Sequence, residues 1–209
     1  LMKKTKRSKK SRSWVIKQHR DQFVKKSKVL GYRSRSAFKL IELNNKFKFL
    51  KNSINLLDIG SSPGGWSQVA SNYVKKGDIL AIDIKDMESL DRVTFLKCDF
   101  LEEEAKDMIL KHFKGKIDVV ISDMAANTTG NKNLDCIRTN QLCVEVINFS
   151  LKLMKNKGIL ISKLFMGEDF LTVQKLAKEK FNKVAFYKPE SSRDESKETY
   201  IHCSLLKSL

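Results

Sequence analysis

The chain has 209 residues, 41% of them hydrophobic, which suffices for one domain with a sizeable core. No apolar run reaches the roughly 18 residues that a membrane-spanning helix needs, so we expect no membrane partner. The net charge is +17, and residues 1–51 hold 18 basic side chains against only Asp21 and Glu42, a local net charge of +16. Such a basic N-terminal quarter is typical of proteins that bind a polyanion, with a solubilising tail as the alternative.

The N-terminal quarter is predicted to begin with a basic, disordered arm over residues 1–12. Residues 13–209 are predicted to form a single domain, whose first part, residues 13–50, is helical and binds a nucleic-acid backbone. Two arginines, Arg33 and Arg35, lie between the two helices expected there and offer charge to a nucleic-acid backbone. The two helices are predicted over Ser13–Val29 and Ser36–Leu50.

From residue 54 onward, short apolar runs alternate with helical patterns. This alternation predicts a doubly wound, mostly parallel α/β sheet with helices on both faces. The last two apolar runs have no helix between them, so at least one C-terminal strand should be antiparallel. The seven predicted strands are Ile54–Leu57, Ile79–Ile82, Val93–Leu96, Ile117–Ser122, Gly158–Lys163, Lys183–Lys188 and Thr199–Leu206. The intervening helices are predicted near residues 67–76, 102–113, 135–155 and 168–180.

The loop after the first of these strands is rich in glycine and reads DIGSSPGGW over residues 58–66. Glycine lets the backbone approach a ligand closely, and free N–H groups at the start of a helix attract an anionic group. A phosphate-binding P-loop is excluded because it needs Gly-Lys-Ser/Thr, and a dinucleotide loop fits only weakly because Pro63 has no N–H. A turn that binds nothing is the remaining alternative to a nucleoside cofactor. The candidate cofactor contacts are Gly60, Gly64, Gly65 and Trp66.

Acidic residues recur at the predicted carboxyl ends of the first four strands, where open α/β sheets bind ligands. They are Asp58, Asp83, Asp99 and Asp123. Asp83 lies near the position at which such folds bind ribose hydroxyls. Asp99 could accept a hydrogen bond from an adenine amino group while Phe100 stacks on the ring. A turn or a helix cap is an equally good reading of any single acid, but four in register favour a cofactor site.

Lys163 ends the fifth predicted strand, where a long cation needs a partner or a function. Asp123, at the end of an adjacent strand, is the candidate partner. A buried ion pair without a further role is the alternative.

The four cysteines show neither paired short spacing nor the density of a disulfide framework. They predict reduced thiols in an intracellular protein, in the cytoplasm or in an organelle such as the mitochondrion if residues 1–20 are the trimmed remainder of a transit segment. The three histidines form no ligand pair, so we expect no metal site.

Five segments stand out when they are taken together: SRSAFKL, DIGSSPGGWSQVA, ISDMAANTTG, ISKLF and KPESSRDESKETYI. In order and spacing they resemble the FtsJ/RrmJ family of S-adenosylmethionine-dependent RNA 2′-O-ribose methyltransferases. The resemblance runs from about Ser13 to the end of the chain. One departure is Ala126, where family members usually have proline after Asp-Met-Ala.

The resemblance implies a Rossmann-like class I methyltransferase fold and transfer of a methyl group from S-adenosylmethionine to a ribose 2′-hydroxyl of RNA. The family's catalytic tetrad falls on Lys39, Asp123, Lys163 and Glu198. The family's cofactor contacts fall on Gly64, Trp66, Asp83, Asp99 and Asp123, with Phe100 beside them. The residues expected to contact RNA are Arg33, Arg35, Lys39 and Arg193.

The short chain resembles the ribosomal RNA branch of the family, which implies a uridine of large-subunit ribosomal RNA as the target. Methylation of tRNA, or a noncatalytic role as an RNA-binding ribosome-assembly factor, are the alternatives. A 2′-hydroxyl target excludes DNA, and we expect a monomer. Lys163 would act either as the general base or, as an ammonium group, by orienting the hydroxyl oxygen. The sequence leaves both roles open.

Overall fold

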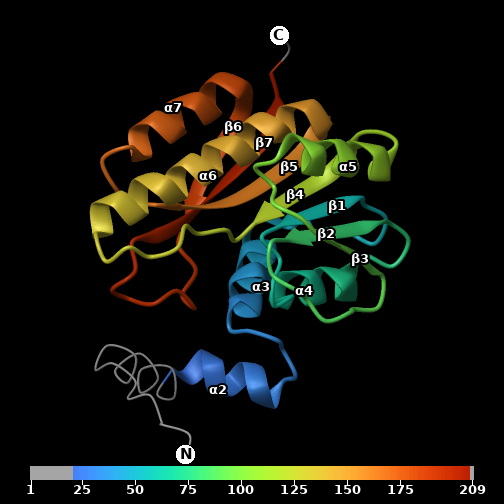
Figure 1. The fold of residues 1–209 in the computed structure, drawn as a ribbon, viewed down its shortest axis with the longest axis horizontal. Helices are drawn as coiled ribbons and strands as arrows, with labels where there is room; N and C mark the ends of the chain where they lie inside the picture. Colours follow the sequence, from blue (N-terminus) through green and yellow to red (C-terminus); the bar gives the residue numbers. More distant parts are fainter. Residues whose placement is uncertain (1–20, 208–209) are drawn as a thin grey trace, which may run out of the picture.

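The fold is a three-layer α/β arrangement in a computed structural model that describes residues 21–207 (Figure 1). One seven-stranded sheet has the strand order β3-β2-β1-β4-β5-β7-β6. The predicted arm over residues 1–12 and the first part of the helix predicted over Ser13–Val29 lie outside the described residues.

The strands are β1 Leu56–Ile59, β2 Ile79–Asp83, β3 Val93–Lys97, β4 Ile117–Ser122, β5 Met154–Phe165, β6 Phe181–Tyr187 and β7 Glu198–Leu206. The helices are α2 Gln22–Val29, α3 Ser36–Phe47, α4 Gly65–Tyr73, α5 Glu103–Phe113, α6 Lys132–Leu153 and α7 Phe170–Lys180. Strands β1 to β5 pair in parallel, whereas β7 lies antiparallel between β5 and β6. This topology confirms the predicted mostly parallel sheet with an antiparallel C-terminal strand.

Each face of the sheet is covered by its own set of helices. Helices α3 and α4 pack on one face through residues such as Leu40 and Val69. Helices α5, α6 and α7 pack on the other face through residues such as Ile109, Ile147 and Val173. Because both faces are buried, the central strands are almost continuously apolar, as parallel strands usually are. Within residues 21–207, no helix has the length and hydropathy to cross a membrane.

Several element boundaries differ from the sequence-based expectation, among them the first strand, the end of helix α6, and the end of β5, which runs past Lys163 to Phe165. The first strand covers Leu56–Ile59, so Asp58 lies inside it and is 1% exposed, not at its carboxyl end. Helix α6 stops at Leu153, because Met154 leaves the helix to pair with Ile117 as the start of β5. Apolar periodicity cannot locate such a boundary, since a buried residue suits a helix and a strand equally.

Candidate active site

A cleft of about 950 Å³ opens at the carboxyl ends of β1 to β4. This is the edge of the sheet at which open α/β folds bind ligands. Of the residues proposed for the cofactor, those that line the cleft are Gly60, Asp83, Asp99, Phe100 and Asp123. Helix α6 contributes Arg138, Gln141, Leu142 and Glu145 to the lining.

The glycine loop needs glycine at two positions of positive φ, Gly60 at 78° and Gly64 at 106°. A Cβ at Gly60 would come within 2.3 Å of Met124 Cγ, and a Cβ at Gly64 within 2.8 Å of Arg33 Nη1. The positive φ therefore favours glycine at both positions, and a side chain there would also displace Met124 or Arg33.

The two acids predicted to hold an adenosine group also organise the backbone of the cleft. Asp83 accepts hydrogen bonds from Ser62 N at 2.9 Å and Lys85 N at 2.8 Å, so it joins the end of β2 to the glycine loop. Asp99 accepts one from Leu101 N at 2.9 Å. A carboxylate has about four lone-pair sites, so both acids retain capacity for a ligand hydroxyl or amino group.

Trp66 and Gly65 lie behind the glycine loop. The Trp66 indole is 2% exposed, donates a hydrogen bond to Ser36 O at 2.9 Å, and lies 5.6 Å from the Tyr200 ring. A Cβ at Gly65 would come within 2.2 Å of Ser34 Oγ. Neither residue, nor Gly64, is among those that line the cleft. Gly65 and Trp66 lie against Ser34 and Ser36, so they support the glycine loop from behind.

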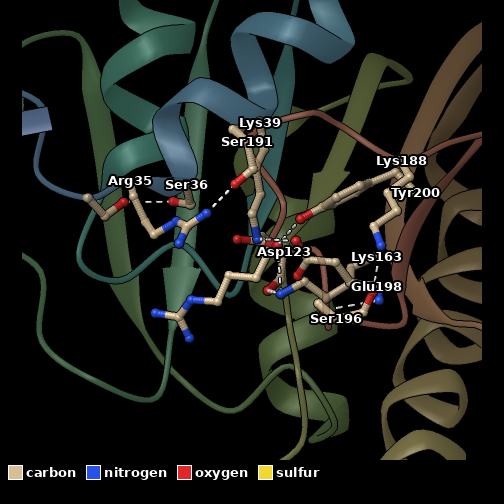
Figure 2. A network of polar contacts seen from close by, with 12 residues as sticks. Arg35, Ser36, Lys39, Asp123, Lys163, Lys188, Ser191, Ser196, Glu198 and Tyr200 are labelled. Atoms are coloured by element: carbon tan, nitrogen blue, oxygen red, sulfur yellow. Dashed lines mark hydrogen bonds and ion pairs between the residues drawn. The ribbon is translucent and has the colours of Figure 1, made fainter. Parts of the chain in front are cut away.

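The four side chains of the predicted tetrad meet beside the cleft, although they come from α3, the end of β4, β5 and the start of β7 (Figure 2). Lys163 Nζ lies 2.7 Å from Asp123 Oδ1 and 2.8 Å from the Asp123 carbonyl oxygen. Lys39 Nζ lies 2.7 Å from Glu198 Oε1. The strand pairing explains this meeting, because β4 and β5 are neighbours and the start of β7 lies opposite the end of β5.

Tyr200 completes the cluster and was not among the predicted site residues. Its hydroxyl donates a hydrogen bond to Asp123 Oδ1 at 2.5 Å, and its fully buried ring lies 5.9 Å from Lys39 Nζ. The sequence did contain a signal for Tyr200. Residues two apart on a strand point to the same face of the sheet, and Tyr200 follows Glu198 by two.

Comparisons with known proteins agree with this geometry. Residues 32–205 match the model of the FtsJ-like methyltransferase family. The chain belongs to the FtsJ-like methyltransferase family. It is 47% identical over 197 residues to "Ribosomal RNA large subunit methyltransferase E" of Pelagibacter ubique (strain HTCC1062), covering 94% of this chain and 97% of that protein. The protein of the same name from Rickettsia akari (strain Hartford) is 42% identical, covering 94% and 89%. These matches confirm the resemblance drawn from the motifs.

Known structures agree with the FtsJ-like assignment. A Plasmodium falciparum crystal structure described as a ribosomal RNA methyltransferase is 32% identical with a TM-score of 0.75, covering 84% of this chain and 98% of that one. Human methyltransferase-like protein 13 is 17% identical with a TM-score of 0.58, covering 81% and 79%, and shares the fold. The sheet is that of a class I methyltransferase, and the chain is a methyltransferase.

The tetrad of this FtsJ-like methyltransferase forms a charge-balanced cluster of two lysines and two carboxylates. Burial acts to raise the pKa of Asp123, but Lys163, Lys39 and two hydrogen bonds together hold that pKa below its usual value. Burial likewise opposes ionisation of Glu198, whereas Lys39 and Lys163 hold its pKa below the usual value. Both carboxylates are therefore ionised at neutral pH. Burial, then the two carboxylates, raises the pKa of Tyr200 well above its usual value, so its hydroxyl stays a donor.

The three arginines predicted to contact RNA make contacts within the FtsJ-like fold. Arg33 donates to backbone carbonyl oxygens of two loops beside the cleft. Arg35 pairs with the Asp21 carboxylate and donates to the Ser191 carbonyl oxygen. Arg193 lies with its Nε 3.5 Å from Asp21 Oδ2. Lys39, also predicted to contact RNA, pairs with Glu198 in the tetrad.

Asp58, in strand β1 just before the glycine loop, has a buried carboxyl group. Its Oδ2 accepts a hydrogen bond from Ser67 Oγ at 2.6 Å, whereas its Oδ1 has no hydrogen-bond partner in the described part of the chain. Burial raises the pKa of Asp58 to about 7, the Ser67 hydrogen bond opposes this rise, and the carboxylates of Asp123 and Asp83 add to it. The folded chain therefore binds a proton that an unfolded aspartate, with a pKa of about 3.9, releases.

Stability should depend on pH through Asp58. A raised folded-state pKa stabilises the fold below about pH 4, and this contribution is lost as the pH rises towards about 7. In Asp58→Asn, this titration is absent. We expect its free energy of unfolding, relative to the unaltered chain, to increase with pH in this window by up to about 1.4 kcal/mol per pH unit. Urea unfolding of both proteins at several pH values measures this, with Asp91→Asn, at a 94% exposed side chain, as control. Parallel pH profiles would contradict the assignment.

Proposed function

We propose that the chain transfers a methyl group from S-adenosylmethionine to the 2′-hydroxyl of a ribose in RNA. The observation that carries this proposal is the Lys39–Glu198 and Lys163–Asp123 cluster beside the cleft. An alcohol is a weak nucleophile until its proton is withdrawn, and a lysine positioned by a carboxylate would either take that proton as a neutral amine or orient the oxygen as an ammonium group.

The cleft fits the proposed cofactor in size and in chemistry. Its volume of about 950 Å³ lies within the usual range for small-molecule sites. Asp83 would accept hydrogen bonds from the ribose hydroxyls, and Asp99 from the adenine amino group, with Phe100 packing nearby. The glycine loop would hold the methionine part. When bound, S-adenosylmethionine supplies a methyl group that its sulfonium makes electrophilic.

We assign a role in the proposed reaction to each residue of the buried cluster. Lys163 removes the hydroxyl proton or, as an ammonium group, orients the oxygen lone pair. Asp123 holds Lys163 through its carboxylate and its carbonyl oxygen, and Tyr200 fixes that carboxylate. Glu198 holds Lys39 through an ion pair.

The proposed substrate is large-subunit ribosomal RNA, with a uridine as the target nucleotide. The names of the Pelagibacter and Rickettsia relatives support large-subunit RNA, and the motif resemblance supports the uridine. The basic residues 1–51 would supply affinity for the RNA backbone, with residues 1–12 as an arm and residues 13–50 as the RNA-binding part of one domain. We further propose that the protein acts inside the cell as a monomer and does not bind DNA.

Transfer of labelled methyl groups from S-adenosylmethionine to large-subunit RNA or pre-ribosomal particles tests the function. Ribose methylation blocks alkaline cleavage of the adjacent phosphodiester bond, so the labelled position should resist alkali. Label on a base would contradict the ribose assignment. Label on tRNA alone would contradict the substrate. Cofactor binding without transfer to any of these RNAs would favour a noncatalytic assembly factor.

A further inference from the structure

Arg33 lies in the segment between α2 and α3. It joins two loops that border the cleft, although it is not among the residues predicted to contact the cofactor. Its guanidinium donates hydrogen bonds to Glu88 O at 2.6 Å, Ser89 O at 2.8 Å and Pro63 O at 3.3 Å. Pro63 belongs to the glycine loop after β1, and the other two carbonyls belong to the loop after β2. Arginine has five N–H donors in a rigid fork and no acceptor, which suits it to bridging several carbonyl oxygens.

Ser62 of the glycine loop makes two further connections: its N donates a hydrogen bond to Asp83 at the end of β2, and its Oγ donates one to Asp86 O, in the loop after β2, at 3.1 Å. Ser62 and Asp83 both line the cleft, whereas Arg33 does not. The spacing between the two loops therefore depends on the hydrogen bonds of Ser62, inside the cleft, and on those of Arg33.

The Arg33 side chain also lies close to the backbone of the glycine loop. A Cβ at Gly64 would meet Arg33 Nη1 at 2.8 Å. The backbone of the segment is fastened to α4 as well, since Arg33 N donates to Gln68 Oε1 at 3.0 Å and Gln68 Nε2 donates to Gly31 O at 2.8 Å. Hydrogen bonds therefore fix both the backbone and the guanidinium of Arg33. Through the guanidinium, the position of this segment is coupled to that of the glycine loop.

We propose that Arg33 is a positioning residue for the methyl donor, which fixes the spacing of the loops after β1 and β2. This role rests on the proposed function, because it concerns the S-adenosylmethionine site. It differs from the role predicted from sequence, in which Arg33 contacts RNA phosphate. The hydrogen bonds to the carbonyls are made by the fold itself, so the role requires no RNA.

The test compares Arg33→Ala and Arg33→Lys with the unaltered full chain. Calorimetric titration of S-adenosylhomocysteine without RNA measures the cofactor site directly. We expect its Kd, and the KM for S-adenosylmethionine, to rise by about tenfold in Arg33→Ala, since charge-assisted hydrogen bonds to both loops are lost. The kcat at saturating cofactor should stay within about twofold, because no reacting group is removed. Arg33→Lys should be intermediate, because one ammonium cannot reach both loops as a fork does.

Arg92→Ala is the matched control. Arg92 also donates to a backbone carbonyl, Lys75 O at 3.0 Å, but this bond does not connect the glycine loop to the loop after β2, because Lys75 follows α4. Its substitution should leave the Kd for S-adenosylhomocysteine unchanged.

Three results would overturn the proposal. One is an Arg33→Ala protein that binds S-adenosylhomocysteine as tightly as the unaltered chain. Another is weaker RNA binding with a salt slope smaller by about one and with unchanged cofactor affinity, which would make Arg33 a phosphate contact. The third is a lower Tm and a lower kcat with unchanged KM, which would indicate a purely structural role. If the unaltered chain itself bound no S-adenosylhomocysteine, the proposed function would fail, and this role with it.

Discussion

Replacing Lys163 with alanine is expected to reduce methyl transfer by at least about 100-fold, the lower end of what a positioned proton-transfer group contributes. Lys163 does not line the cleft, so the affinity for S-adenosylhomocysteine should stay close to that of the unaltered chain. Single-turnover transfer to RNA at saturating cofactor measures the loss in the chemical step. Intact cofactor binding shows at the same time that the variant is folded.

A closely matched lysine provides the control for Lys163. Lys155 also lies on β5 and pairs with an aspartate of β4, Asp118, at 2.7 Å, but it is half-exposed and lies at the opposite end of the strand. Lys155→Ala should therefore retain activity. Lys163→Arg separates the two roles proposed for Lys163, because a guanidinium is always charged and cannot accept a proton. Substantial activity in Lys163→Arg would contradict the general-base role and favour orientation of the hydroxyl.

Asp123→Asn is expected to lose activity by a similar factor and to lower the free energy of unfolding by about 3 kcal/mol, as removal of one partner of a buried ion pair usually does. The carboxylate of Asp123 is the common partner of Lys163 Nζ and the Tyr200 hydroxyl. Its neutral replacement leaves two buried lysines with the single carboxylate of Glu198. Urea unfolding and single-turnover transfer together measure the two effects.

The pH dependence identifies the cause of the Asp123→Asn effect. The lowered pKa of Asp123 stabilises the fold above the usual value for aspartate, about 3.9, and this contribution is lost as the pH falls. The stability difference between Asp123→Asn and the unaltered chain should therefore shrink in acid. Asp118→Asn, which alters the half-exposed pair with Lys155, should cost at most about 1 kcal/mol and leave transfer intact. An active Asp123→Asn protein would refute the proposed role.

The architecture was predicted well from the sequence because the spacing of apolar residues along a strand or a helix reflects which side chains are buried. The runs that became β2, β3 and β4 were located almost to the residue, and β2 and β4 are buried on both faces. Contacts between residues far apart in the sequence were harder to predict. Lys39 is one lysine in a lysine-rich region, and only the motif resemblance distinguished it from a solvated charge.

Trp66 and Arg33 show why the surroundings of a motif are harder to predict than the motif itself. The glycine loop was recognisable, but the residues behind it depend on how the α2–α3 segment packs. Trp66 lies in the core against Tyr200, and Arg33 donates hydrogen bonds to backbone carbonyls of two loops. Backbone carbonyls are present in every sequence, so no local pattern marks the ones that an arginine will reach.

The place of β7 inside the sheet has a consequence for how the protein is made. Translation proceeds from the N-terminus, so β1 to β6 emerge before the strand that must enter between β5 and β6. Until then, β5 presents an unpaired edge that can associate with other chains, and Glu198 is not yet available to Lys39. Strand β7 therefore completes this sheet and the proposed catalytic cluster together, so a chain interrupted before β7 should be both aggregation-prone and inactive.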